Sequence, residues 1–475
     1  MRVHLFLVVG AIALLALAVP SAASAATPWT PLVTASSSIA SASAAQLVAG
    51  ADGHITAAWL SSSEVVVATS TDDGETWSAE QVVSTGVSPS GAPHIAALGT
   101  QTVVVTWPRS DGSLLGSTSI TGGSSWSAPY EIAPAGSDVT APQLAADGTF
   151  AVATWHAFAS PTLGVVVSTT RDGLTWSVPT PISDPTNNFE PQVAVAGSRA
   201  TIVWYAFVTG ANVIRSSSTT DAGVTWSSPV DVAPPEPNTY APQLALAPDG
   251  TVTAAWVTTG TLRTATSIDG GLSWLPQRIL TGTVTRWRIA AVNGTAVIVW
   301  TENSAAVASR TVDDGLTWSA PQQISTPGDV VIRADVVASG TEVTVLAAYD
   351  PGTGTVIGES TSSDGGLTFR PFARLSASST VIDPTLALTN GGEAIAAWGT
   401  GSELVFTSRI APPVTPAALP ATGGEAAPWL LAGLLLVASG VAARRARSRL
   451  RPVRPAGTGG ISSASPGYIS QVESR

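Results

Sequence analysis

One octapeptide recurs seven times along the chain and constrains the fold more than any other feature. Its general form is Ser/Thr-x-Asp-x-Gly-x-Thr-Trp. Five copies keep the Asp, at residues 70–77, 219–226, 267–274, 311–318 and 362–369. Two are degenerate: residues 119–126 carry Thr121 at the Asp position, and residues 169–176 carry Arg171 there with Asp172 beside it. Because the closing aromatics are 44 to 51 residues apart, the chain is predicted to consist of tandem structural units.

Each unit also contains a second aromatic, which closes a strand-like run. These runs alternate between small apolar and polar residues, as in residues 251–256. A shorter apolar run precedes each of them, and Gly, Asp and Pro separate the runs, so every unit predicts four short β-strands joined by turns. The second series of aromatics comprises Trp59, Trp107, Trp155, Trp204, Trp256, Trp300, Tyr349 and Trp398.

The octapeptides resemble the Asp-box, or bacterial neuraminidase repeat, of β-propellers, and the resemblance covers residues 29–410. It implies an all-β fold in which every unit is one four-stranded blade. Within a box the Asp would accept N–H bonds across a tight turn, the Gly would adopt a positive φ, and the aromatic would pack between neighbouring sheets. We therefore expect a structural role, and neither calcium binding nor catalysis, for Asp72, Asp221, Asp269, Asp313 and Asp364.

Eight aromatics in the second series but only seven boxes leave one blade without an outer strand. Residues 29–33 resemble the sequence that begins at the closing aromatic of each box, and Trp29 lies 48 residues before Trp77. We expect this N-terminal strand to complete the blade built from residues 383–410 and so to close one ring. The sequence thus predicts a single propeller over residues 26–410 with eight blades; seven is the alternative, if one unit fails to form a blade.

Residues 1–25 have the layout of a secretory signal peptide. Arg2 precedes an apolar run over residues 5–19, Pro20 breaks the run, and small residues lead to a cleavage site after Ala25. A retained membrane anchor is the alternative, but the run is shorter than the roughly 20 residues that a spanning helix needs. Export is therefore predicted. Since the chain has no cysteine, the exported fold must depend on a large core instead of disulfides.

The C-terminal part combines several elements in a fixed order. A Pro-rich spacer (411–418) leads to a pentapeptide, an apolar segment (426–443) and an arginine-rich tail (444–475). The order resembles the wall-sorting signal of Gram-positive surface proteins, although the tail continues for 24 residues past Arg451 and is longer than in that family. The pentapeptide consists of Leu419, Pro420, Ala421, Thr422 and Gly423.

This second resemblance implies covalent attachment to the cell wall. The apolar segment would form a transmembrane helix, and the arginines would hold the exported chain in the membrane with the positive charges inside. A sortase would then cut between Thr422 and Gly423 and join the Thr422 carboxyl group to a peptidoglycan amine. A single-span anchor that stays in place is the alternative. In both cases the protein is predicted to be secreted and held at the cell surface.

The composition excludes several kinds of chemistry. The chain has no cysteine, and all 21 of its basic residues are arginine, which excludes cysteine-ligated metals, cysteine nucleophiles and lysine Schiff bases. His94 and His156 are too isolated to predict a metal site, and no cofactor is expected. Residues 27–418 carry 30 acidic residues and 13 arginines without a basic stripe, so nucleic acid is not expected as a partner.

A ring of polar residues is the candidate ligand face. In a propeller, the innermost strand of each blade begins on the face opposite the box turns and lines the central channel. Alignment of the units places one polar residue per blade at this start, and a concave mouth with such side chains is the default binding site. Alternatively, the side chains satisfy backbone groups or channel waters. The residues are Gln46, His94, Gln143, Gln192, Gln243, Arg288, Arg333 and Thr385.

A third resemblance concerns catalysis. Residues 287–290, Trp-Arg-Ile-Ala, are similar to the aromatic-Arg-Ile-Pro motif of sialidases with these boxes, but the Pro is missing and the motif lies late in the chain. It would make Arg288 and Arg333 carboxylate-binding residues. No pattern selects the catalytic partners, and eight blades depart from the six of that family. The residues available for that role are Tyr205, Tyr349, Glu190 and Glu302.

We therefore favour a wall-anchored module that binds a glycan or a protein, as a ligand-binding or adhesion domain without catalytic residues. An exo-sialidase-like glycoside hydrolase is the first alternative. A structural wall protein without a ligand is the second.

Overall fold

The computed structural model describes residues 29–34, 43–50, 53–148, 150–158, 164–185, 187–292, 294–376, 381–389, 391–400 and 403–409. Every regular element in these ranges is a β-strand, and within them no helix is long and apolar enough to cross a membrane. The predicted signal peptide, spacer, sorting pentapeptide, apolar segment and arginine-rich tail lie outside the described residues.

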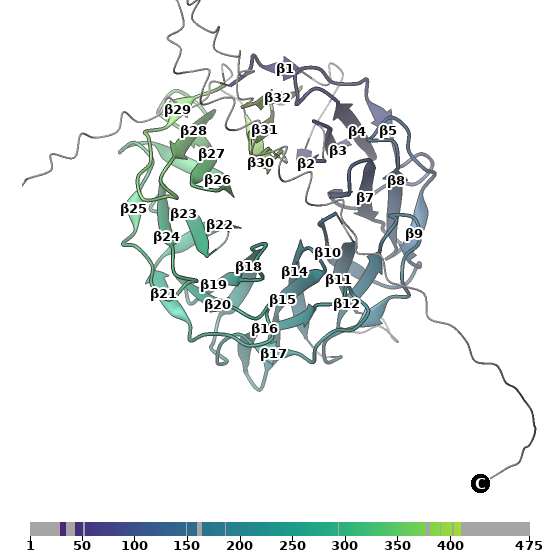
Figure 1. Ribbon diagram of the computed structural model, residues 1–475, viewed down its shortest axis with the longest axis horizontal. Coiled ribbons are helices and arrows are strands. Elements are labelled where there is room, and N and C mark those ends of the chain that lie inside the picture. The colour runs from purple at the N-terminus through teal and green to yellow at the C-terminus, as the bar shows by residue number, and fades with distance from the viewer. Residues whose placement is uncertain are drawn as a thin grey trace, which may run out of the picture. The chain divides into compact units, whose positions relative to one another are not determined.

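Eight four-stranded antiparallel sheets confirm the predicted all-β propeller and its count of eight blades. Figure 1 shows the sheets arranged in sequence order around one axis. The innermost strands of successive blades contact one another, and β2 contacts β30 where the two ends of the ring meet. The ring is therefore closed.

The blades are numbered along the chain, each from its innermost strand outward. Blade 1 consists of β2 (Ser43–Ala49), β3 (Ile55–Ser61), β4 (Glu64–Ser70) and β5 (Gln81–Val82). Blade 2 consists of β6 (His94–Leu98), β7 (Thr102–Pro108), β8 (Leu114–Ser119) and β9 (Tyr130–Ala133). Blade 3 consists of β10 (Val139–Ala146), β11 (Ala151–Ala157), β12 (Gly164–Thr170) and β13 (Thr180–Pro181). Blade 4 consists of β14 (Asn188–Ala196), β15 (Arg199–Val208), β16 (Ala211–Thr219) and β17 (Val230–Asp231).

The second half of the ring repeats this plan. Blade 5 consists of β18 (Thr239–Leu246), β19 (Val252–Thr258), β20 (Thr261–Ser267) and β21 (Arg278–Thr281). Blade 6 consists of β22 (Val284–Val292), β23 (Thr295–Glu302), β24 (Ala305–Thr311) and β25 (Gln322–Gln323). Blade 7 consists of β26 (Val330–Ser339), β27 (Glu342–Asp350), β28 (Val356–Ser362) and β29 (Ala373–Arg374). Blade 8 consists of β30 (Ile382–Leu388), β31 (Ala394–Gly399), β32 (Leu404–Ser408) and the N-terminal β1 (Val33–Thr34).

The core lies between the blades. Both faces of a blade pack against neighbours, so middle strands such as β11 and β19 are buried along their whole length. A box aromatic sits in each of seven of these interfaces. Trp77, for example, packs against apolar residues of blades 1 and 8 and stacks on Phe406 with ring centroids 3.9 Å apart. The seven tryptophans of the second series are fully buried: Trp59, Trp107, Trp155, Trp204, Trp256, Trp300 and Trp398.

The box turns use the Asp side chain within the turn itself. In all five complete boxes, the Asp Oδ1 accepts the N–H of the residue four positions later, at 2.8 to 2.9 Å. Gly74 in the first box has a φ of 90°, which L-residues rarely adopt. Hydrogen bonds from the Thr225 hydroxyl and N–H, and from Thr219, lower the pKa of Asp221 to about 2. The carboxylate is therefore ionised and engaged at neutral pH.

The two degenerate boxes keep the same turn by different means. Thr121 replaces the Asp, and its hydroxyl oxygen accepts the Ser125 N–H at 3.0 Å. In the other box the sequence alignment was wrong by one residue: Asp172, and not Arg171, accepts the Thr175 N–H at 2.7 Å, and Thr170 donates to Asp172 at 3.0 Å. This turn is one residue shorter, which an alignment anchored on Trp176 cannot detect.

The N-terminal strand closes blade 8, as predicted. Val33 and Thr34 pair with Phe406 and Val405 of β32. Upstream of this short strand, the Thr30 N–H donates to the Ser408 carbonyl at 2.9 Å, and the Ser408 N–H donates to the Thr30 hydroxyl at 3.1 Å. In blade 1, Ser78 makes the same two bonds with Thr69 after its box. The N-terminal segment thus substitutes for the chain that follows a box.

A largely buried arginine, Arg409, lies next to the N-terminal strand that closes blade 8. Arg409, the last described residue, forms an ion pair with Glu359 of blade 7, and both side chains are largely buried. The Arg409 guanidinium also lies 5.2 Å from the ring centre of Trp29. Trp29 itself packs on the apolar cluster between blades 7 and 8. Arg409 therefore connects the two chain ends of the ring to the preceding blade.

Candidate functional site

The eight polar residues of the predicted ring occupy one register position. Each lies on the innermost strand of its blade and pairs with the residue directly before the second-series aromatic. Box residues bond to the loops at the other end of these strands: Asp73 donates its N–H to the Gly53 carbonyl, and Asp314 donates to Gly294. The polar residues lie near the middle of the innermost strands and not at their start as predicted, except for His94, which begins β6. The boxes contact the loops at one end of these strands, and we call the side toward the other end the mouth.

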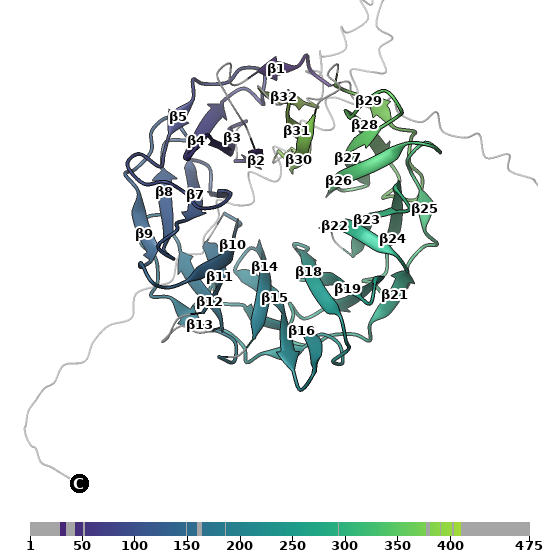
Figure 2. The same ribbon diagram turned by 180° about the vertical axis from the view of Figure 1, so that it is seen from behind.

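Four of the eight residues line one cavity at the mouth. This mouth cavity of about 390 Å³ lies between blades 6, 7, 8 and 1. Figure 2 labels the innermost strands of these blades, β22, β26, β30 and β2. Its polar side chains include Asp335 and Asp383, which the sequence did not predict. The predicted residues among its lining are Gln46, Arg288, Arg333 and Thr385.

A second cavity adjoins the first and shares Arg288 and Arg333 with it. This arginine cavity of about 170 Å³ adds the exposed Arg286, and no carboxylate lines it. Trp287, between the two arginines of β22, is buried in the cluster between blades 5 and 6 and holds that strand in place. The predicted Gln243 lines this cavity. His94, Gln143 and Gln192 line neither of the two cavities.

Carboxylates of the following blades face two of the three arginines. Arg333 of blade 7 forms an ion pair with Asp383 of blade 8. Arg288 of blade 6 is held more loosely, with its Nε 3.8 Å from Asp335 Oδ1. The Asp335 carboxylate accepts two N–H groups, from Val336 and from Leu386 of blade 8, each at 3.0 Å. Asp335 is thus a fixed link between blades, and Arg288 keeps donors for a ligand.

The charged side chains of the mouth stand at positions where most other blades have small apolar residues. At the position two residues after the ring residue, Asp335 is the one polar residue, and the others are Val48, Ala96, Ala145, Ala194, Ala245, Ala290 and Ala387. Two residues before it, Glu190, Arg286 and Asp383 are charged, and the other five blades have Ala or Val. Side chains two apart point to the same face of a regular strand, which applies to Arg286 and Asp335. Asp383 lies in the β-bulge of β30, with a φ of 47°. This comparison between repeats could have identified Arg286, Asp335 and Asp383 from the sequence.

The residues considered for sialidase chemistry do not share a cavity with Arg288. Tyr349 is buried in the interface of blades 6 and 7, and burial followed by the charge of Asp329 raises its pKa. Tyr205 stacks on Phe189, and burial followed by the charge of Glu190 raises its pKa. Glu302 accepts hydrogen bonds from Thr281 and Trp300 at 3.0 and 3.2 Å. None of these groups lines either cavity that contains Arg288.

His94 and His156 are both held neutral by their surroundings. Burial lowers the pKa of each to about 4. His156 packs against Phe158 and Phe189, with ring centroids 4.1 and 5.2 Å away. Among the described residues, no group of three or more His, Asp or Glu side chains could hold a metal ion.

Replacement of His94 is expected to reduce the loss of stability in mild acid. A histidine whose pKa falls from 6.5 to about 4 on folding favours the unfolded state as pH drops through this window. Between pH 7 and pH 5 this costs about 2 kcal/mol. His94→Gln, which introduces the residue of four other blades, should remove that part. Urea unfolding at pH 7 and pH 5 measures the free energy of unfolding of both proteins. If the difference between the two pH values is the same in His94→Gln as in the wild type, His94 is not held neutral by burial. Both values lie above the range in which the box carboxylates titrate.

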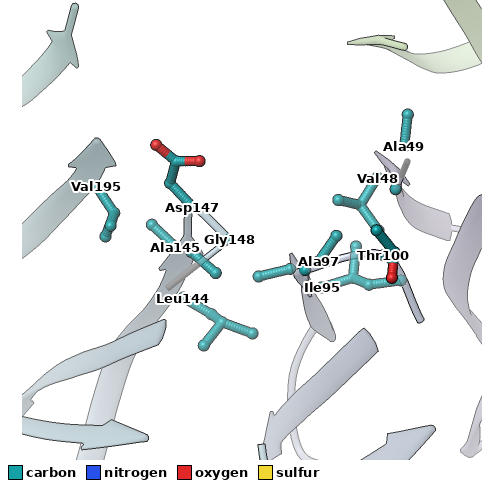
Figure 3. A pocket seen from close by; sticks show the side chains of 14 residues that line it. Val48, Ala49, Ile95, Ala97, Thr100, Leu144, Ala145, Asp147, Gly148 and Val195 are labelled. Atoms are coloured by element: carbon teal, nitrogen blue, oxygen red, sulfur yellow. The ribbon is translucent and has the colours of Figure 1, made fainter. Parts of the chain in front are cut away.

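A larger cavity lies at the box end of the ring. It has a volume of about 520 Å³ and is lined by blades 1 to 4. Figure 3 shows aliphatic side chains such as Val48, Ile95 and Leu144 around it, with the Asp147 carboxylate among them. Asp147 already accepts the Gly197 N–H at 2.7 Å. The mouth, where several polar groups converge, therefore fits a specific ligand better.

Comparisons with known proteins agree with this architecture. The family model of the BNR repeat-like domain matches residues 53–284. No curated protein matches the chain. Similar solved structures include a Hadza microbial sialidase (TM-score 0.36, 15% identity, 70% of this chain and 66% of that one). A protein of unknown function from Dyadobacter fermentans has a TM-score of 0.40 and 15% identity, over 70% and 97% of the chains. The NanB sialidase from Streptococcus pneumoniae has a TM-score of 0.36 and 12% identity, over 68% and 67%.

The chain thus spans about two thirds of the length of these two sialidases. Its seven boxes, its eight closed blades and the family match support one conclusion. Residues 53–284 match the BNR repeat-like domain and lie within an eight-bladed β-propeller.

Proposed function

We propose that this protein is a wall-anchored module that binds an acidic glycan at the mouth of its ring. The arginine cavity carries the proposal, because Arg286, Arg288 and Arg333 meet there without a lining carboxylate. Guanidinium groups bind carboxylates through paired N–H donors. The neutral side chains of Gln243 and Thr285 beside them suit sugar hydroxyls. An acidic protein ligand would use the same arginines.

Loss of an arginine is expected to weaken binding. Arg286→Gln or Arg288→Gln should each reduce the affinity for acidic glycans about tenfold or more, because a hydrogen bond to a charged group is lost. Binding is measured on an array of acidic glycans and their carboxyl-reduced counterparts. Arg278→Gln is the matched control, since Arg278 is exposed on the outer strand of blade 5. Equal binding of acidic and carboxyl-reduced glycans by the wild-type protein would refute the proposal. Wild-type affinity of a variant that carries both Arg286→Gln and Arg288→Gln would also refute it.

A sialidase-like hydrolase is the competing function, and a fluorogenic sialoside distinguishes the two. Tyr205, Tyr349 and Glu302 line neither cavity that contains Arg288, which favours binding without turnover. Turnover by the wild-type protein that disappears in Arg288→Ala would establish the hydrolase instead.

Wall anchoring is the second part of the proposal, and its support is the order of the sequence elements at residues 411–475. We expect Thr422→Ala to remove the protein from the wall fraction that muramidase releases and to leave it in the membrane fraction. Retention of this variant in the wall fraction would refute sorting at Thr422 and Gly423.

A further inference from the structure

The mouth presents acidic groups directly beside the arginine cavity, and this arrangement narrows the class of ligand. The inference rests on the proposed binding of an acidic glycan. Arg288 and Arg333 line both cavities, so a ligand held by the arginines extends into the cavity that contains Asp335 and Asp383. A ligand that is only anionic would place its second unit next to these two carboxylates.

Asp383 has an acceptor that remains open. Its Oδ1 pairs with Arg333, its side chain is 41% exposed, and no hydrogen bond to its Oδ2 occurs among the described residues. Both oxygens of Asp335, in contrast, accept backbone N–H groups. A carboxylate offers about four acceptor sites, so Asp383 can receive a cation without giving up Arg333. Gln46 and Thr385 line the same cavity and can bond to hydroxyl groups.

We propose that the ligand is a zwitterionic saccharide, in which an acidic sugar and an amino sugar with a free ammonium group are neighbours. The carboxylate binds Arg286 and Arg288, and the ammonium group binds Asp383. Long-range electrostatics favour such a ligand over a polyanion. Residues 27–418 carry 17 more acidic residues than arginines, and this field repels a polyanion but exerts no net force on a zwitterion.

The placement of the charges within the repeat supports one built site. Arg286, Arg288, Arg333, Asp335 and Asp383 stand on three consecutive blades, 6, 7 and 8. Most other blades have Ala, Val or a neutral polar residue at these positions. Charges of both signs therefore gather on one side of the mouth.

A matched pair of probes tests the inference on the full-length protein in detergent. The probes are a hexuronic acid–glucosamine disaccharide with a free amine and the same disaccharide N-acetylated. We expect the free amine to bind about tenfold more tightly, as an added hydrogen bond between charged groups would give. Asp383→Asn should bring this ratio close to one and leave binding of the acetylated probe intact or stronger, because Arg333 is released. Titration calorimetry measures both affinities.

The outcomes separate this inference from the proposed function. Asp231→Asn is the matched control, because Asp231 is also paired with an arginine but lies on the outer strand of blade 4; it should keep the wild-type ratio. Equal affinities of the two probes in the wild-type protein would overturn the zwitterionic ligand and leave acidic glycan binding standing. An unchanged ratio in Asp383→Asn would overturn the role of Asp383. Binding of neither probe, together with an array on which no acidic glycan binds, would overturn both proposals.

Discussion

A chain that begins at residue 35 is expected to lose about 5 kcal/mol or more of its free energy of unfolding. The truncation removes β1, exposes the β32 edge, and deletes the bonds of Thr30 to Thr407 and Ser408. It also removes Trp29 from the cluster between blades 7 and 8; large-to-small changes at such sites cost about 3 kcal/mol. Urea unfolding, followed by tryptophan fluorescence, measures the loss.

A synthetic peptide of residues 26–34 provides the complementary test. Added in excess, it should restore part of the lost stability, because it binds the folded ring and not the unfolded chain. A chain that begins at residue 29 is the control and should unfold like the mature protein. Unchanged unfolding of the truncated chain would show that blade 8 does not depend on the N-terminal strand.

The second large effect is expected at the ion pair of Glu359 and Arg409. Glu359→Ala would leave the Arg409 charge without its partner at a site where its side chain is only 9% exposed. Such a loss costs about 3 kcal/mol or more. Replacement of both residues by leucine should recover most of it, because the desolvation penalty of both charges disappears. Chemical unfolding of Glu359→Leu, Arg409→Leu and the double variant gives the coupling energy.

If the losses of stability in the two single variants simply add up in the double variant, this interpretation is contradicted. Arg409 would then contribute only its apolar contact with Trp29. Arg215, which pairs with Asp184 and Asp231 on the outer rim, offers the control. Its carboxylate partners are more than half exposed, so Asp231→Ala should change stability by less than about 1 kcal/mol.

The fold could be predicted from the sequence because every blade repeats the same physical requirement. A buried aromatic in every unit, tryptophan in seven and Tyr349 in blade 7, and a box aromatic in seven of the interfaces recur at a nearly constant spacing, so the number of blades could be counted. The strand that closes the ring was identified because Trp29 and Thr30 copy the residues after a box. The error at Arg171 arose where one turn lost a residue, a change that leaves the aromatic spacing almost intact.

The site was less predictable. The alignment of the repeats selected one position per blade, and Arg288 and Arg333 were found because they stand at it. Arg286, Asp335 and Asp383 stand two residues away. The pleat of the strand brings Arg286 and Asp335 to the same face, and Asp383 lines the cavity from the β-bulge of β30. Which charges meet depends on contacts between blades, such as that of Arg288 with Asp335. These contacts follow from the packing of whole sheets and cannot be derived from one strand.

The position of Arg409 determines where a C-terminal tether would pull on the ring. A side chain at Gly74 of the first box would contact Ser408, so the last described residues of the ring lie on the side of the boxes. Tension on the tether would act on β32, which is hydrogen-bonded to β31 on one side and to β1 on the other. The hydrogen bonds of β32 to both neighbours would bear this force together. The N-terminal strand β1, which closes the ring, would therefore also help to keep the ring closed when a bound ligand is pulled.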